Sequence, residues 1–497
     1  MSLEGKISRD LLINIADTLD SYRVRVLIDA KEEILDSGIY NEEQYYIILF
    51  KMVEDEMKKY SLYQYLNQIE SGDLKLLKEF SKLHSLELVK TLSLLELLHN
   101  EKLVKVEYIF DNAIDETNES EEKIFKDIAI QSNKISPSEI KSIYEPVKVI
   151  FDSKICSGCG LCVGICPVNC IELNNGCGRI DDDKCIRCGL CYYFCPRTYL
   201  PVNILNMVQE HTSQIPPPSK VGFFSEAYSA RTKIKEISDL CQDGGISSTC
   251  LYYLFDQSEI DYALGASMSE NPWRPEPLLM KSKRDVLLTT GTKYVNNPNL
   301  SLMNKINGNT QRLAIVGVPC MMQALLKSEI YDLHIPSQNS VVYRIGIFCM
   351  ESFSYESFLK ICELLKVNVE DVKKADINKG KFFIYTKDEE EFNIPIKDIT
   401  HLAREDCEVC YDLTSESADI SIGSIGSPSG WNTVLIRTQK GKILYEALLK
   451  NDLIESKSLD TVKPGLPLLE KVAASKKKKC STHIAKKKTE HIRTPSY

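Results

Sequence analysis

CSGCGLCVGICPVNCIELNNGCGRIDDDKCIRCGLCYYFCP, residues 156–196, contains one cysteine pattern twice. The first copy reads Cys-x2-Cys-x2-Cys-x3-Cys-Pro from Cys156 to Pro167, and the second repeats that spacing from Cys185 to Pro196. In two-cluster ferredoxins, three closely spaced thiolates hold three irons of one cubane, and the fourth cysteine of each run binds the other cluster. The stretch therefore predicts a bacterial-type ferredoxin fold with two [4Fe–4S] clusters.

This crossed arrangement assigns four cysteines to each cluster. The first set is Cys156, Cys159, Cys162 and Cys195, and the second is Cys185, Cys188, Cys191 and Cys166. Zinc is the alternative, but a structural zinc ion needs only four ligands and does not call for the x3-Cys-Pro ending twice. Gly158, Gly160 and Gly189 let the backbone approach the clusters, so nearby N–H groups can donate to sulfur. Cys170 and Cys177 fall outside both runs, and we expect them to be ordinary thiols.

Length and composition limit the class of protein. The 497 residues predict about three domains, and 43% apolar with 26% charged residues is typical of a soluble globular chain. No run approaches about 18 apolar residues, and the start at Met1 shows no secretory signal, so we expect a cytoplasmic protein without a membrane span. Ten of the 18 cysteines lie between 156 and 195. In a reducing compartment this crowding favours metal ligation over disulfides.

Residues 1–112 are predicted to form a helical domain. Within residues 83–109, two short helices followed by an alternating strand resemble a winged helix, a fold that often binds DNA. Residues 1–150, however, carry 19 Lys/Arg against 29 Asp/Glu, a balance of −10. Binding duplex DNA requires clustered positive charge, so we favour protein docking over inert packing, and either of these over nucleic-acid binding.

Composition divides the rest of the chain. The acidic residues 113–147 are predicted to be a linker, 148–202 the ferredoxin domain and 203–219 a Pro-rich linker. Residues 220–460 alternate β-rich apolar runs with helical segments, which indicates a mixed α/β domain and an α+β multidomain chain overall. Residues 461–497 carry 10 Lys/Arg against 2 Asp/Glu. We expect a disordered tail there, either solvated or in contact with an acidic partner or an anionic membrane surface.

The chemistry must lie in residues 220–460, because all eight ferredoxin ligand positions are cysteine and leave no iron open to a substrate. No Gly-x-Gly-x-x-Gly follows a strand there, so a Rossmann site is not supported. Six separated motifs are present: Asp239–Ser248, Thr290–Tyr294, Val316–Cys320, Gly346–Cys349, Cys407-x2-Cys410 and Ala418–Gly426. Together and in this order they resemble the family of beta subunits of coenzyme F420-reducing hydrogenases and dehydrogenases over about residues 220–445. A ferredoxin segment is often fused in front in that family.

The resemblance implies a flavin-binding domain with a [4Fe–4S] cluster of its own. Carried over position by position, the ligands would be Cys320, Cys349, Cys407 and Cys410. Without the family, Cys407-x2-Cys410 could be half a zinc site or a redox dithiol. Two further cysteines end apolar strand-like runs, and strand ends converge in such sheets, which supports a four-thiolate site. The remaining cysteines are expected to be structural or incidental: Cys241, Cys250, Cys362 and Cys480.

The resemblance also places FAD against two segments. The implied contacts are Gln242, Gly244, Gly245, Ser247, Thr292, Lys293 and Tyr294. Glycines leave backbone N–H groups bare at the start of a helix, where they can bind a cofactor phosphate. Lys293 could offset negative charge on the flavin, and Tyr294 could stack on a ring. A surface lysine and a core aromatic are the alternative interpretations of these two residues, and a plain helix-start turn is the alternative for the glycines.

A function follows from the resemblance. Hydride from reduced coenzyme F420 would reach FAD, because a flavin exchanges both hydride and single electrons. Single electrons would then pass through the third cluster and the ferredoxin pair to a partner redox subunit or complex. Cluster potentials span roughly −700 to +450 mV, so the sequence does not set the direction. Two alternatives stay open. One is a ferredoxin-dependent flavin reductase acting on another organic substrate. The other is an iron–sulfur redox-sensing transcriptional regulator, but the acidic charge of the N-terminal domain argues against DNA binding.

Overall fold

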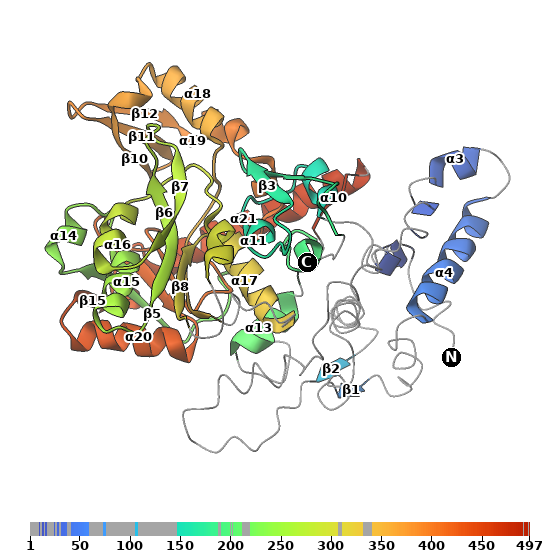
Figure 1. Cartoon of the computed structure of the whole chain (residues 1–497), viewed down its shortest axis with the longest axis horizontal. Coiled ribbons are helices and arrows are strands. Elements are labelled where there is room, and N and C mark those ends of the chain that lie inside the picture. The colour runs from blue at the N-terminus through green and yellow to red at the C-terminus, as the bar shows by residue number, and fades with distance from the viewer. Residues whose placement is uncertain are drawn as a thin grey trace.

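The computed structural model describes the cluster-bearing and C-terminal parts of the chain in most detail (Figure 1). The described residues lie mainly in 147–497, with gaps at 187–189, 199, 201, 211–218, 307–310, 332–339, 491 and 496. Before residue 147 they are 9, 12–13, 15–16, 24, 27–28, 31–36, 41–58, 73–75 and 105–107. None of the helices in these ranges is long and apolar enough to cross a membrane.

Two helices of the N-terminal region are described over their whole length, α3 (Lys31–Asp36) and α4 (Glu42–Lys58). Helix α4 starts after Asn41, whose side chain accepts from Gln44 N at 2.9 Å while the Gln44 side chain accepts from Asn41 N at 3.0 Å. This reciprocal pair satisfies two backbone donors at the helix start. Two short strands, β1 (Asp73–Lys75) and β2 (Lys105–Glu107), pair in parallel. The predicted winged helix lies outside the described residues except for β2.

The ferredoxin segment is built from short elements around a hairpin. Its helices are α10 (Lys148–Asp152), α11 (Leu161–Gly164) and α12 (Leu190–Tyr193). Strands β3 (Ile171–Asn174) and β4 (Cys177–Ile180) pair antiparallel through a two-residue turn, Asn175-Gly176. Both turn residues have positive φ, 50° and 77°, which is the backbone that an Asn-Gly hairpin turn requires.

Helix α13 (Val202–Glu210) follows the ferredoxin segment directly. The prediction of a linker from residue 203 is therefore wrong for its first eight residues. Leu205 and Gln209, four positions apart and so on one helix face, are both buried, and Gln209 donates to Ala418 O in the following domain. The Pro-rich part of the predicted linker lies outside the described residues.

An eight-stranded mixed sheet forms the centre of the next domain, in the order β15-β5-β14-β13-β9-β8-β6-β7. The strands are β5 (Glu226–Thr232), β6 (Tyr262–Met268), β7 (Pro275–Met280), β8 (Leu313–Gly317), β9 (Val341–Ile347), β13 (Ile420–Gly423), β14 (Asn432–Ile436) and β15 (Ile454–Ser458). Neighbours among β6, β8, β9 and β13 run parallel, and the other pairs run antiparallel. The mixed α/β architecture expected for this region is confirmed.

Helices cover both faces of this sheet. Helices α15 (Ile246–Asp256) and α20 (Gln439–Lys450) pack on one face, where Val434 and Ile436 of β14 point. Leu435 points to the opposite face, since side chains alternate along a strand, and packs with Leu469 of α21 (Gly465–Thr489). The remaining helices here are α14 (Lys235–Ser238), α16 (Lys283–Thr289) and α17 (Pro319–Tyr331), with the 3-10 helices η1 (Asn299–Lys305) and η5 (Leu459–Thr461).

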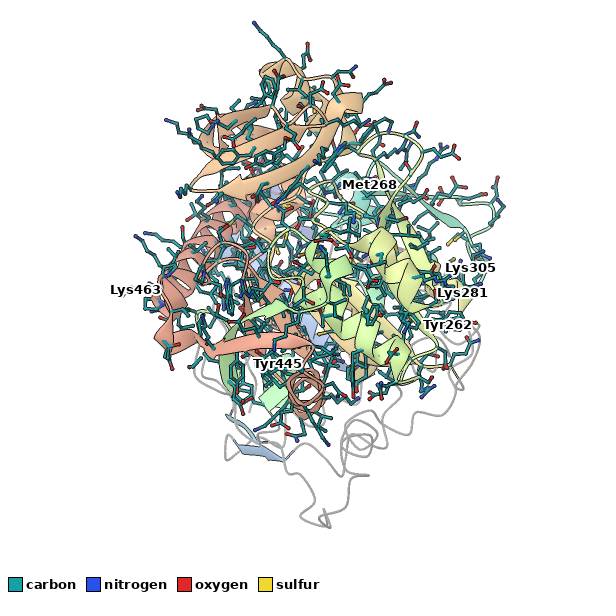
Figure 2. The ribbon with its side chains drawn as sticks, turned by 90° about the vertical axis from the view of Figure 1, so that its left-hand side faces the viewer. Tyr262, Met268, Lys281, Lys305, Tyr445 and Lys463 are labelled. Atoms are coloured by element: carbon teal, nitrogen blue, oxygen red, sulfur yellow. The ribbon has the colours of Figure 1, made fainter. Side chains whose placement is uncertain are left out.

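A smaller three-stranded antiparallel sheet lies beyond one end of the large sheet. In Figure 2, β6 runs from Tyr262 up to Met268, whose end faces this smaller sheet. The small sheet contains β10 (Val372–Asn378), β11 (Lys381–Thr386) and β12 (Glu391–Pro395), and α18 (Tyr355–Leu365) packs against it. Helix η2 (Val369–Asp371) joins α18 to β10, and three short helices follow the small sheet: α19 (Ile396–Ile399), η3 (Thr400–Leu402) and η4 (Glu405–Val409).

The prediction of a disordered C-terminal tail is wrong. Residues 465–489 form the 25-residue helix α21, which packs against η4 and the large sheet. After Gly465, its buried positions are Leu469, Ala473, Lys476 and Cys480, which are spaced by four, three and four residues and so form one face of a helix. The run of lysines led to the prediction of disorder, because charge runs are typical of solvated segments.

Candidate iron–sulfur and flavin sites

The structure brings Cys195, the last cysteine of the second run, to the cysteines of the first run. Burial, followed by the neighbouring Cys159 thiol, raises the pKa of Cys195 to about 11. Cys162 also has a raised pKa, through burial first and then through the nearby Cys156 and Cys159 thiols. Thiols this close and this buried are costly as thiolates unless a metal shares their charge. The crossed set predicted for the first cluster is thus assembled.

A small cavity lies where the second cluster is predicted. Three of the four predicted ligands, Cys166, Cys185 and Cys191, line it, and Cys188 lies outside the described residues. Apolar side chains such as Ile171 and Leu190 complete the wall. Cys170 also lines this cavity, although it lies outside both cysteine runs and was expected to be an ordinary thiol. Its Sγ lies 3.5 Å from Cys166 Sγ.

Backbone N–H groups donate to sulfur at four of the predicted ligands. The contacts are Gly158 N to Cys156 Sγ, Cys170 N to Cys166 Sγ, Arg197 N to Cys195 Sγ and Ser352 N to Cys407 Sγ, each 3.4 Å long. Such contacts stabilise charge on a thiolate and tune cluster potentials. Gly158 adopts φ +64°, a conformation that favours glycine, and this places its N–H as the sequence predicted.

The third predicted cysteine set comes from three places in the chain. Cys320 lies in the first turn of α17, Cys349 follows β9, and Cys407 and Cys410 lie in and just after η4. Strands β8 and β9 are parallel neighbours, so the segments that follow them leave the sheet at the same edge.

Each of these four cysteines has at least one other member of the set as a neighbour. Burial raises the pKa of Cys349 to about 11, with Lys476 opposing and Cys410 adding to the shift. The pKa of Cys320 is also raised, chiefly by burial, and Cys410 contributes. Cys407 has Cys349 as a neighbour. The structure therefore gathers all four residues that the family resemblance proposed as ligands.

The spacing of these thiols bears on the zinc alternative. Among the described residues, no three His, Cys, Asp or Glu side chains are placed to hold one metal ion. The ligands of a cubane bind different irons, whereas the ligands of a zinc ion converge on one atom. The assignment of the third cysteine set to a cluster stays a prediction.

The two segments expected to contact FAD lie side by side. The Ser248 and Thr290 hydroxyls are 3.2 Å apart and join the start of α15 to the end of α16. At Gly244, a Cβ atom would meet Ala230 O and lie 2.6 Å from Asn432 N, so a side chain does not fit there. Gly245 adopts φ +70° directly before α15.

Polar atoms in this glycine turn are only partly satisfied. Ile246 N, the first N–H of α15, donates to the Asn432 side chain at 3.2 Å. Gln242 Nε2 is buried and has no hydrogen-bond partner among the described residues. An unpaired buried donor is costly, and a ligand oxygen would satisfy it. The turn therefore fits a bound cofactor at Gln242, while the first helical N–H is already engaged. Ser247 and Thr292 are half-buried beside it.

Lys293 and Tyr294 have partners within the protein. Lys293 Nζ donates to the carbonyls of Thr289, Thr290 and Gly291 at 2.7, 3.0 and 3.0 Å, which are the last carbonyls of α16 and the turn after it. Burial lowers the pKa of Lys293 to about 8. The Tyr294 ring packs edge-to-face on Phe382 at 5.5 Å, and its hydroxyl accepts from Ile377 N at 3.1 Å. These contacts agree with the core interpretation of Tyr294, and flavin contact by either residue stays a prediction.

Buried cations near the cysteines were not found from the sequence. Arg197, Lys327 and Lys476 are each at most 5% exposed, and Arg404 is 10% exposed. Arg197 directly follows the second Cys-Pro, a position that could have marked it. Lys476 could have been found only from its helical spacing to Leu469 and Cys480. The cysteine carbonyls that Lys327 and Arg404 contact lie more than a hundred residues away, so no local pattern places these two cations beside the cysteines.

Known families match almost the whole of the described C-terminal part. Residues 148–204 match the 4Fe-4S dicluster domain. Residues 227–304 match the N-terminal part, and residues 310–462 the C terminus, of the coenzyme F420 hydrogenase/dehydrogenase beta subunit.

Individual relatives agree with these matches. The coenzyme F420 hydrogenase subunit beta of Methanothermobacter thermautotrophicus is 37% identical over 279 residues, which cover 55% of this chain and 99% of the relative. A subunit of the F(420)H(2) dehydrogenase of Methanosarcina mazei is 34% identical over 340 residues, 67% of this chain and 93% of the relative. A chain of the F420-reducing [NiFe] hydrogenase complex from Methanosarcina barkeri superposes with a TM-score of 0.54 at 34% identity, covering 57% of this chain and 98% of that one. This chain therefore belongs to the family of coenzyme F420 hydrogenase/dehydrogenase beta subunits, which are oxidoreductases, with a 4Fe-4S dicluster domain in front.

Proposed function

We propose that the chain is an iron–sulfur flavoprotein subunit that passes electrons between coenzyme F420 and a partner redox protein or complex. The family membership, the dicluster domain and the third cysteine set support this function. F420 exchanges hydride, whereas clusters exchange single electrons, and a bound FAD supplies the chemistry that connects the two. The partner is a redox subunit of hydrogenase, dehydrogenase or reductase type.

The observation that carries the proposal is the closeness of the third cysteine set to the first ferredoxin set. Cys159 is among the charged neighbours that raise the pKa of Cys320, after burial, whose effect is largest. Arg197 has Cys410 and Cys320 of the third set as neighbours and is itself a neighbour of Cys159 in the first set. We infer that the thiolate sites form a row from the family domain into the ferredoxin segment.

This arrangement orders the sites along the row. The third set adjoins the first ferredoxin set, and Cys162 of that set has Cys191 of the second among its neighbours. The second ferredoxin site, with the cavity lined by Cys166 and Cys185, is thus at the far end from Cys320. We assign the third site to exchange with the flavin and the second ferredoxin site to exchange with the partner.

On the flavin side, the chain's own residues would bind and orient the cofactor. The glycine turn at Gly244 and Gly245 packs tightly against the backbone of β5 and β14, and Gln242 Nε2 beside it offers an unpaired donor. Lys293 contributes a buried positive charge at the edge of the same region. In the hydride step no side chain of this site is needed as an acid or a base, so positioning is the main contribution.

The test is electron transfer from reduced F420. The protein is purified anaerobically, loaded with iron, sulfide and FAD, and mixed with reduced F420 and a viologen dye. We expect wild type to oxidise F420. Cys320→Ala should keep the ferredoxin pair but lose turnover. The matched control is Cys362→Ala, because Cys362 is equally buried but lies in the core of the small sheet.

Each result decides a separate point. Normal turnover by Cys320→Ala would show that the third ligand set is wrong. A wild-type protein that carries its clusters and FAD but leaves reduced F420 untouched would show that another carrier is the substrate.

A further inference from the structure

Three buried cations each donate to the backbone carbonyl of a predicted cluster ligand. Arg404 Nη2 lies 2.6 Å from Cys156 O, Lys327 Nζ lies 2.8 Å from Cys195 O, and Lys476 Nζ lies 2.6 Å from Cys349 O. Burying a cation costs several kcal/mol unless negative charge accompanies it. The three cations come from separate parts of the chain, and each reaches a cysteine set that would carry net negative charge as a cluster. Arg404 also pairs with the Asp406 carboxylate at 2.8 Å, so a cluster would be the second negative charge beside it.

Lys476 is the one that faces the third set. Its Nζ donates to both Cys349 O and Asp412 O, at 2.6 and 2.8 Å, and so joins the segment after β9 to the segment after η4. The side chain is 5% exposed. Its charged neighbours include Cys410, Cys349, Cys407 and Asp412. Lys476 therefore lies beside three of the four predicted ligands and would face the negative charge of a cluster held there.

The helix that carries Lys476 is firmly held. Leu469 and Ala473 pack against the large sheet, and the matched family region ends at residue 462, before α21 begins. Figure 1 shows α21 beside the ferredoxin segment, and Ile484 packs against the core of that segment.

The chain end adds further contacts to the same region. The Tyr497 hydroxyl donates to Val409 O at 2.5 Å and accepts from Arg197 at 2.7 Å. Its ring packs edge-to-face on Tyr411 at 4.9 Å. The C-terminal segment therefore closes over the third cysteine set.

We propose that Lys476, carried on α21, is a positioning residue for the third cluster. Its two hydrogen bonds fix the segments that carry Cys349 and Cys410. Its fixed charge favours the reduced cluster, which bears one more negative charge than the oxidised one, so Lys476 raises the reduction potential of that cluster. The inference rests on the proposed function, because it requires the third cluster to be present.

Redox titration of four full-length proteins tests the proposal. Wild type is compared with Lys476→Met, which removes the charge and the donors, and with Lys476→Arg, which retains both. Lys478→Met is the matched control, since Lys478 is an exposed lysine two positions along the same helix. Each protein is analysed for iron and then titrated under anaerobic conditions while the third cluster's electron paramagnetic resonance signal is followed.

We expect about twelve irons in wild type, from three cubanes. In Lys476→Met, the reduced-to-oxidised ratio of the third cluster at a fixed potential should fall at least tenfold, about 59 mV for one electron. Selective loss of about four irons from this variant alone would equally support the positioning role. Lys476→Arg and Lys478→Met should behave like wild type.

Two results would overturn the inference while leaving the proposed function intact. One is a Lys476→Met protein with wild-type iron and wild-type potential, and the other is an equal shift in Lys478→Met. A wild-type protein with about eight irons would remove the third cluster itself, and with it both the inference and the proposed function.

Discussion

Replacing Arg404 with methionine should destabilise the packing of the ferredoxin segment against the family domain. The Arg404 guanidinium pairs with Asp406 at 2.8 Å and donates to Cys156 O at 2.6 Å and Gly176 O at 3.0 Å. Methionine retains the apolar stem and removes every donor. The carboxylate of Asp406, 5% exposed, would then retain only the longer ion pair to Arg197, at 3.7 Å.

The burial of this pair sets the size of the effect. Breaking a buried ion pair by removing one partner costs about 3–5 kcal/mol. The carbonyl of Gly176 lies in a partly exposed hairpin turn and can bind water once Arg404 is removed. Its loss of a donor therefore adds nothing to the predicted free-energy cost. A domain of 150–250 residues loses about 2–4 °C of melting midpoint per kcal/mol, so the midpoint should fall by roughly 6–20 °C.

The assay is anaerobic thermal melting followed by the visible absorbance of the clusters. It reports the cluster-bearing part directly, which matters because chains with several domains do not unfold in one step. The matched control is Arg312→Met. Arg312 pairs with Asp261 at 3.0 Å with 48% of its side chain exposed, so the loss should be about 0–1 kcal/mol. If Arg404→Met melted within the range of this control, our account of the interface would be refuted.

Three further predictions concern individual residues. Gly244→Ala should reduce flavin content several-fold, since the added Cβ would displace the backbone at Asn432. Iron content should stay unchanged, and undiminished flavin would count against the turn as a cofactor site. Cys170→Ser should keep both ferredoxin clusters, because the predicted ligand sets are complete without it, and loss of about four irons would make Cys170 a ligand. Burial raises the pKa of Glu416 from 4.5 to about 7, with Asp412 adding to the shift, so the folded state binds more protons between these values. Stability from Glu416 should therefore fall as pH rises from about 4.5 to 7, and Glu416→Gln should lack this slope in melting midpoints; identical slopes would contradict the assignment.

The ferredoxin segment could be predicted in detail because its chemistry fixes its spacing. Four thiolates must reach one cubane, and the x3-Cys-Pro ending sends one of them to the neighbouring cluster. That requirement is local to about forty residues, so it appears in the sequence as a repeated pattern. The Asn175-Gly176 turn between β3 and β4 is local in the same way.

The remaining site residues depend on contacts between distant segments, which no local pattern displays. Tyr294 finds its hydrogen-bond donor in Ile377, 83 positions away, and Lys476 reaches Cys349 over 127 positions. The tail was predicted to be disordered because its buried helix face contains only four side chains. The lysines on the other faces dominate the composition and obscure the helical spacing of those four. Helix α13 was missed because the prolines after it dominated the composition of its segment.

The most direct test of the central claim is the iron and flavin content of the anaerobically purified chain. The account predicts about twelve irons, held as three cubanes, and one FAD per chain. A folded protein with about eight irons and no flavin would contradict it, because the family domain would then hold neither of the groups assigned to it.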